Sequence, residues 1–110
     1  MGSLYYGDDQ DPIEIDDRLL AHVKVVMATK LRRNESFTLS WRHAAGTPGR
    51  STIWVQPSIP LRFVFDSAEA ESLDPALLSS LANSANSSGG MSITVEHEAA
   101  SAASKPTVAA

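Results

Sequence analysis

The chain contains no cysteine among its 110 residues. This absence excludes disulfides, thiolate zinc sites and cysteine nucleophiles, and it agrees with a protein of a reducing cytoplasm. Long hydrophobic runs are also absent, because no segment approaches the roughly 18 apolar residues that a membrane-spanning helix needs. The first residues lack the basic and apolar regions of a secretory signal. We therefore expect a cytoplasmic protein that makes no contact with a membrane.

Motifs for nucleotide and hydrolase chemistry are missing as well, since neither G-x-G-x-x-G nor G-x-S-x-G occurs. The segment AAGTPGRST has neither the glycine that a phosphate-binding loop needs at Ala44 nor the lysine that it needs at Arg50. It also lies between two expected strands, where no helix N-terminus can complete its amides. The histidines, His22, His43 and His97, lack the spacing of metal ligands. We expect no cofactor, no metal and no catalytic residue.

What the chain does contain is the composition of a globular protein, with 43% hydrophobic and 20% charged residues. A chain of this length forms one domain with a modest core. We place a single α+β domain at residues 1–96. The Ala/Ser-rich segment 97–110 is predicted to be a disordered tail.

Two hydrophobic periods divide the domain into strands and helices. Apolar residues at helical spacing predict a helix over residues 17–33, and a second helix that starts at Pro75 after an Asp74 cap and stops before Gly89 and Gly90. Every-second-residue alternation predicts the strands. The order is ββαβββαβ, with strands within residues 3–7, 11–15, 35–43, 51–56, 61–66 and 91–96.

Because every strand alternates, the sheet has one covered face, which favours an antiparallel or mixed arrangement. Each helix has a single apolar stripe, so we expect both helices on that face. The opposite face would then carry aromatic and arginine side chains, of which we select Tyr5, Arg42, Trp54 and Arg62.

This exposed set suggests two functions. Aromatic rings and guanidinium groups on an open sheet bind single-stranded nucleic acid, by stacking and by phosphate pairing. The alternative is a homodimer or a partner-docking surface, where tryptophan and arginine are also enriched. Both hypotheses describe a small non-enzymatic binding or interaction module.

The charges of the chain lie in blocks, although the formal net charge is −4. Residues 1–17 carry six carboxylates and no Lys or Arg, and residues 63–110 carry six carboxylates and one lysine. The central block, residues 18–62, holds eight Lys and Arg side chains and a single glutamate. Such a block could form a basic patch for phosphate, or it could pair with the acidic segments within the fold.

Within the central block we single out a basic cluster, formed by Lys30, Arg32, Arg33 and Arg50. Its first three members follow the apolar part of the first helix. There they complement the negative end of the helix dipole, and this structural role, together with pairing to the acidic hairpin, is the interpretation that we favour.

Four stretches of the chain resemble a family of small actinobacterial proteins of unknown function: MGSLYYGD, IEIDDRLLAHVKVVMATKLRRNESFTLSW, RSTIWVQPSIPLRFVF and LANSANSSGG. The resemblance covers about residues 1–96. Members of that family often carry the name ATP-dependent DNA ligase. Ligases of that class form a lysyl adenylate on the lysine of a K-x-D-G motif.

The lysines of this chain are followed by VVM, LRR and PTV, so none stands in a K-x-D-G motif. The chain is also too short to add a nucleotidyltransferase core to a second clamping domain. No catalytic residue is carried over, and ligase activity is not expected. The resemblance implies at most an accessory association with DNA.

Overall fold

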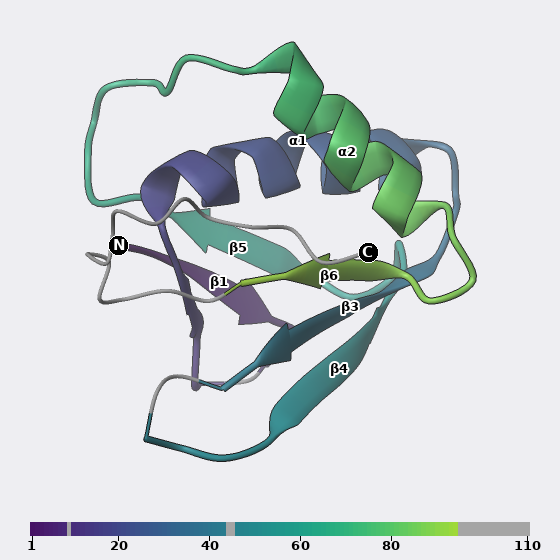
Figure 1. Cartoon of the computed structure of the whole chain (residues 1–110), viewed down its shortest axis with the longest axis horizontal. Coiled ribbons are helices and arrows are strands. Elements are labelled where there is room, and N and C mark those ends of the chain that lie inside the picture. The colour runs from purple at the N-terminus through teal and green to yellow at the C-terminus, as the bar shows by residue number, and fades with distance from the viewer. Residues whose placement is uncertain (9, 44–45, 95–110) are drawn as a thin grey trace.

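The computed structural model describes residues 1–8, 10–43 and 46–94 of the chain. Figure 1 shows two helices lying over six strands, in the predicted order ββαβββαβ. The elements are β1 (Gly2–Tyr6), β2 (Ile13–Ile15), α1 (Asp17–Arg32), β3 (Phe37–Arg42), β4 (Arg50–Val55), β5 (Leu61–Val64), α2 (Pro75–Ala85) and β6 (Met91–Ile93).

Local signals in the sequence set the ends of both helices. The Asp16 carboxylate accepts hydrogen bonds from the backbone N–H groups of the second and third helical residues, at 3.1 and 3.3 Å, and thereby caps α1. Asn34 adopts a positive φ of 61°, which ends the helical path. Asp74 caps α2, and Pro75 occupies its first turn, where a missing N–H costs nothing.

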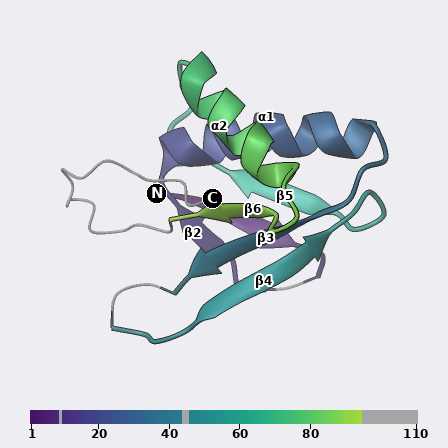
Figure 2. The same cartoon turned by 45° about the vertical axis from the view of Figure 1, so that its right-hand side comes forward.

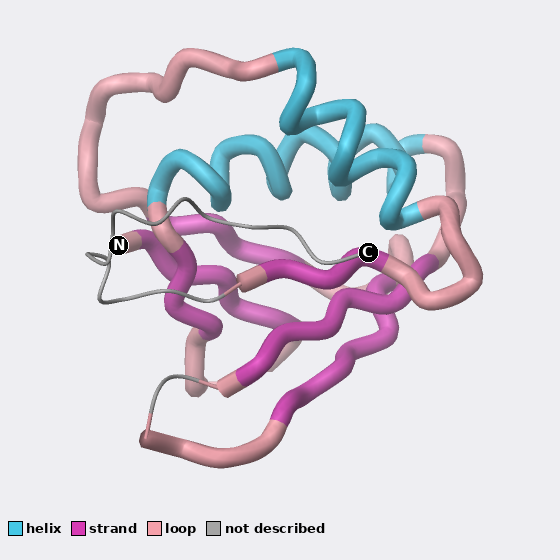
Figure 3. The backbone as a smooth tube through the Cα atoms, viewed as in Figure 1, coloured by secondary structure: helices cyan, strands magenta, loops and turns pink. Residues whose placement is uncertain are grey.

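The strands form two sheets of three strands each. Sheet A has the order β2-β1-β5 and is antiparallel throughout. Sheet B has the order β4-β3-β6, with an antiparallel β3–β4 pair and a parallel β3–β6 pair. Figure 3 shows the strands beneath the helical layer. The predicted α+β class is confirmed, with an antiparallel sheet and a mixed one.

The chain passes from sheet B to sheet A through the short segment 56–60, which contains Pro57 and Pro60. Because proline cannot donate to a sheet ladder, neither β4 nor β5 extends into this segment. The Gly7 N–H donates to the Pro60 carbonyl at 2.8 Å and continues the β1–β5 pairing within sheet A, whereas the Tyr6 hydroxyl donates to the Trp54 carbonyl and joins the two sheets. The structure thus has two sheets in place of the single sheet expected from the sequence, because β4 pairs with β3 and β5 pairs with β1.

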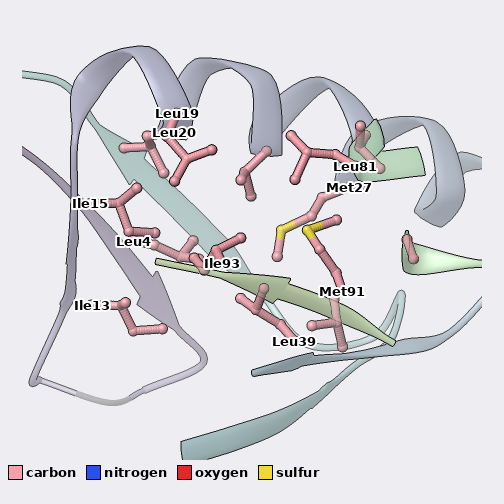
Figure 4. Packing of buried hydrophobic residues seen from close by; sticks show 14 of the residues in the cluster. Leu4, Ile13, Ile15, Leu19, Leu20, Met27, Leu39, Leu81, Met91 and Ile93 are labelled. Atoms are coloured by element: carbon pink, nitrogen blue, oxygen red, sulfur yellow. The ribbon is translucent and has the colours of Figure 1, made fainter. Parts of the chain in front are cut away.

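Both helices lie on the same side of the two sheets, as Figure 2 shows from a second direction. The side chains between the layers form one hydrophobic core, and Figure 4 shows residues of both sheets pointing toward the helices. The buried members are Leu4, Ile13, Ile15, Leu19, Leu20, Val23, Val26, Met27, Phe37, Leu39, Val55, Leu81, Ala85, Met91 and Ile93. Within the described residues, neither helix is long and apolar enough to cross a lipid bilayer.

A fully buried histidine fastens the start of α2 to α1. The ring nitrogens of His22 lie 2.7 Å from the Arg18 carbonyl oxygen and 2.7 Å from the Asp74 backbone nitrogen. Since a backbone N–H only donates, Nε2 accepts from Asp74, and Nδ1 carries the proton and donates to Arg18. The Arg18 guanidinium reinforces the link through the Asp74 carboxylate at 3.2 Å.

A second buried polar group fastens the other end of α2. Lys30 is only 8% exposed, and its Nζ donates to the Asn86 side-chain oxygen at 2.6 Å and to the Glu35 carboxylate at 3.0 Å. Its ammonium also lies 5.7 Å from the centre of the Phe37 ring. The lysine therefore joins the end of α1 to the C-cap of α2 and to the start of β3.

We predict that His22→Leu lowers the free energy of unfolding by about 1–3 kcal/mol, because the partly buried Asp74 N–H would lose its acceptor. Urea denaturation followed by circular dichroism measures this change. Thr29→Val is the matched control, because it removes only a side-chain hydrogen bond to the Val25 carbonyl within the same helix. Equal stability of the two variants would contradict the proposed role of His22.

Candidate nucleic-acid interface

The face of sheet B that points away from the helices is built from alternate residues of its strands. Phe37, Leu39 and Val55 are buried on the inner side, so their neighbours in the strands point outward. We call the outward set the outer face of sheet B. Its members are Thr38, Ser40 and Arg42 from β3, Arg50, Thr52 and Trp54 from β4, and Ser92 from β6.

Strand pairing arranges these side chains in rows across the sheet. Trp54 lies opposite Thr38, and Thr52 lies opposite Ser40, which on its other side is paired with Ser92. Ser40 Oγ and Thr52 Oγ1 are 2.8 Å apart and share a hydrogen bond. The middle of the outer face is therefore small, polar and uncharged.

One end of the outer face carries the exposed indole ring of Trp54, which is 57% exposed. Beside it, Gly90 has a φ of +79°, and a side chain there would collide with Thr38, whose carbonyl oxygen would lie 2.7 Å from the added Cβ. Only glycine fits this position. The loop after α2 can therefore pack closely against β3 beside the ring.

The opposite end of the outer face carries two arginines that lie directly across from each other, Arg42 on β3 and Arg50 on β4. Both are exposed, and neither has an ion-pair partner among residues 1–8, 10–43 and 46–94. Like charges in this position repel and destabilise a strand pair. No Asp or Glu occurs in β3, β4 or β6 to offset them.

A hollow of about 480 Å³ lies at the arginine end. Both guanidinium-bearing residues line it together with hydroxyl groups and His43; the lining residues are Ser40, Trp41, Arg42, His43, Arg50, Ser92, Ile93 and Thr94. Guanidinium and hydroxyl donors are the groups that bind phosphate oxygens. The hollow is therefore chemically suited to an anion.

His43 holds the hairpin end that presents the arginines. Its backbone N–H donates to the Gly49 carbonyl at 2.9 Å, and its Nδ1 lies 3.1 Å from the Pro48 carbonyl oxygen. Because a carbonyl only accepts, Nδ1 donates, and Nε2 accepts from the Ser51 hydroxyl at 2.7 Å. The sequence pattern gave no indication of this contact, which joins residues on either side of a loop.

Tyr5 and Arg62, the other two residues predicted for the binding face, lie on sheet A. They are opposite each other on β1 and β5, and the guanidinium carbon of Arg62 is 5.3 Å from the centre of the Tyr5 ring. Arg62 therefore stacks on Tyr5 within the protein itself. The four selected residues are thus divided into one pair on each sheet.

The basic cluster proposed from the sequence is also divided. Lys30 is buried and bound to Glu35, whereas Arg32 and Arg33 are exposed at the end of α1. Arg50 lies opposite Arg42, which is the last residue of β3. This position is about 17 Å along β3 from its first residue, which is the end of the strand that follows α1. Arg50 belongs to the outer face of sheet B instead.

No group of three His, Asp or Glu side chains that could hold a metal ion occurs in the described part of the chain.

Comparison with protein families gives one finding for this chain. A family model described as "Domain of unknown function (DUF7882)" matches residues 1–96. Comparisons with curated proteins and with solved structures gave no match.

We predict that Arg50→Gln raises the free energy of unfolding by about 0.2–1 kcal/mol at low salt, because it removes the repulsion from Arg42. The gain shrinks at high salt, where exposed charges are screened. Arg32→Gln, which removes the same charge from the last turn of α1, is expected to destabilise by about 0.3–1 kcal/mol. Urea denaturation at two salt concentrations measures both variants. A loss of stability in Arg50→Gln would show that the arginine has a structural role.

Proposed function

The chain belongs to the DUF7882 family, a domain of unknown function, and we propose that it binds single-stranded nucleic acid on the outer face of sheet B. The role is that of a binding module without catalysis. The observation that carries the proposal is the placement of Arg42 and Arg50 opposite each other, with no ion-pair partner among the described residues, on the same face of sheet B as the exposed Trp54.

The arginine pair supports the phosphate part of the proposal. Two cations face each other although the chain as a whole has a formal net charge of −4. A bound phosphate would neutralise their mutual repulsion and accept hydrogen bonds from both guanidinium groups. An arrangement that costs stability in the free protein becomes favourable when an anion is bound.

The exposed ring supports the base part of the proposal. Stacking of a base on an aromatic side chain contributes about 1–3 kcal/mol and tolerates any base. Trp54 and Arg50 are separated by four positions of β4, which is about 13 Å along the strand. This is the distance that a bound strand must span between the base on Trp54 and the phosphate at the arginine pair.

The hydroxyl groups between the two ends suit a strand that lies along β4. Ser92 and whichever of Ser40 and Thr52 accepts their mutual hydrogen bond can donate to phosphate or sugar oxygens without adding charge. Tyr5 and Arg62 are left out of the proposed site because Arg62 already covers the tyrosine ring.

Fluorescence anisotropy of a labelled single-stranded oligonucleotide at low salt tests the proposal. We expect the logarithm of the observed binding constant to fall linearly with the logarithm of the salt concentration. The combined variant Arg42→Ala/Arg50→Ala should reduce the steepness of that line by about 0.7, since the two arginines share one phosphate and each phosphate contact to a single strand contributes about 0.7. Trp54→Ala should weaken binding by about 1–3 kcal/mol and leave the salt dependence unchanged.

Arg32→Ala/Arg33→Ala is the control, because it removes the same number of charges from the end of α1 and not from sheet B. Light scattering on the same samples measures the oligomeric state. It tests the alternative that a second copy of the chain covers the outer face of sheet B. A stable dimer that dissociates on Trp54→Ala substitution, together with no salt-dependent oligonucleotide binding, would replace the proposed function with self-association.

A further inference from the structure

Trp54 lines a second hollow, which has a volume of about 260 Å³. Its lining comes from the end of α1, from residues 36–38 at the start of β3, from β4, and from the end of α2 with the loop that follows it. Besides Trp54, the polar lining includes Ser36, Thr38, Asn86 and Ser88. We call this hollow the Trp54 slot.

The fold fixes which polar atoms are offered to the slot. Lys30 donates to the Asn86 side-chain oxygen at 2.6 Å, so the amide nitrogen of Asn86 is left as a donor. Ser36 and Ser88 are exposed, and their hydroxyls make no hydrogen bond to another described residue. The slot therefore offers one amide donor and two hydroxyls that donate or accept.

The charge of the slot distinguishes it from the arginine end. Lys30 also lines the slot, but its ammonium is already paired with Glu35 at 3.0 Å. No unpaired cation remains among the described lining residues to attract a phosphate. A ligand of this slot is expected to be uncharged, with a flat apolar face for Trp54 and a polar edge.

We infer that the Trp54 slot receives one nucleobase of the bound strand, with the base stacked on the indole ring and its edge hydrogen-bonded to Asn86, Ser36 and Ser88. This inference rests on the proposed function and adds base recognition to it. The volume of about 260 Å³ lies just below the range of about 300–1,000 Å³ for pockets that hold drug-sized ligands, and it suits a single base.

A saccharide is the other flat-faced, uncharged ligand that a tryptophan with amide and hydroxyl neighbours could take. The arginine pair on the same face favours the base, because a nucleic acid strand provides phosphates for Arg42 and Arg50 while one base occupies the slot. A neutral saccharide would leave those two charges without a partner.

Anisotropy with two kinds of labelled strand separates the slot from the phosphate contacts. A homo-oligonucleotide and an abasic strand with the same number of phosphates are compared on the wild-type protein. We expect the abasic strand to bind at least about ten-fold more weakly, with an unchanged salt dependence. The four homo-oligonucleotides should also differ in affinity, because the donors and acceptors of the slot suit some base edges better than others.

The double variant Ser36→Ala/Ser88→Ala should reduce that difference between bases and leave the salt dependence in place. Ser80→Ala, an exposed serine of α2 outside the slot, is the matched control. Equal affinity for all four homo-oligonucleotides, together with weaker binding of the abasic strand, would overturn the inference and leave the proposed function standing. Equal binding of the abasic and base-containing strands would overturn the inference and also the stacking on Trp54, and would leave only the phosphate contacts. Salt-insensitive or absent binding of every strand would remove both.

Tryptophan fluorescence quenching tests the saccharide alternative, with a neutral oligomer of glucose as the probe. The variant Trp41→Phe is used because the chain has two tryptophans, so that its tryptophan fluorescence comes from Trp54 alone. Quenching by the oligonucleotide and not by the saccharide is the expected result. Quenching by the saccharide alone would overturn the inference in favour of a carbohydrate site.

Discussion

The fold depends on the attachment of α2 to α1 by buried polar contacts at both of its ends. His22 accepts the N–H of the residue that caps α2, and Lys30 binds the residue that ends it. Hydrophobic contact alone would allow α2 to slide along α1, because apolar packing is non-directional. Hydrogen bonds made by buried groups fix the position, since any displacement would leave them unsatisfied.

This attachment has consequences for sheet B. Because α2 ends at a fixed point, the loop after it delivers β6 to the edge of β3 in parallel register. Gly90 makes the close approach to Thr38 possible. The inner residues of β6 complete the core, and its outer residue, Ser92, extends the row of hydroxyls. The helical layer and the outer face are thus linked through the path of one loop.

The outer face combines features that a purely structural surface would avoid. Arg42 and Arg50 face each other without a carboxylate in the strands that carry them, and Trp54 exposes more than half of its surface. The helices, in contrast, have well-placed caps, and the core is continuous. Local features that reduce stability within an otherwise consistent fold are typical of binding sites, because the ligand supplies the missing interactions.

Local patterns in the sequence determined the type, order and approximate ends of the elements, because capping, helical spacing and strand alternation each act within a few residues. They also determined which side of each strand is polar, so Trp54 and Arg42 could be selected before the fold was known. The tertiary structure decided which of these polar faces share a sheet. Strand partners are distant in sequence, and no local pattern records that β4 and β5 belong to different sheets, that Arg62 covers Tyr5, or that Arg50 lies across from Arg42.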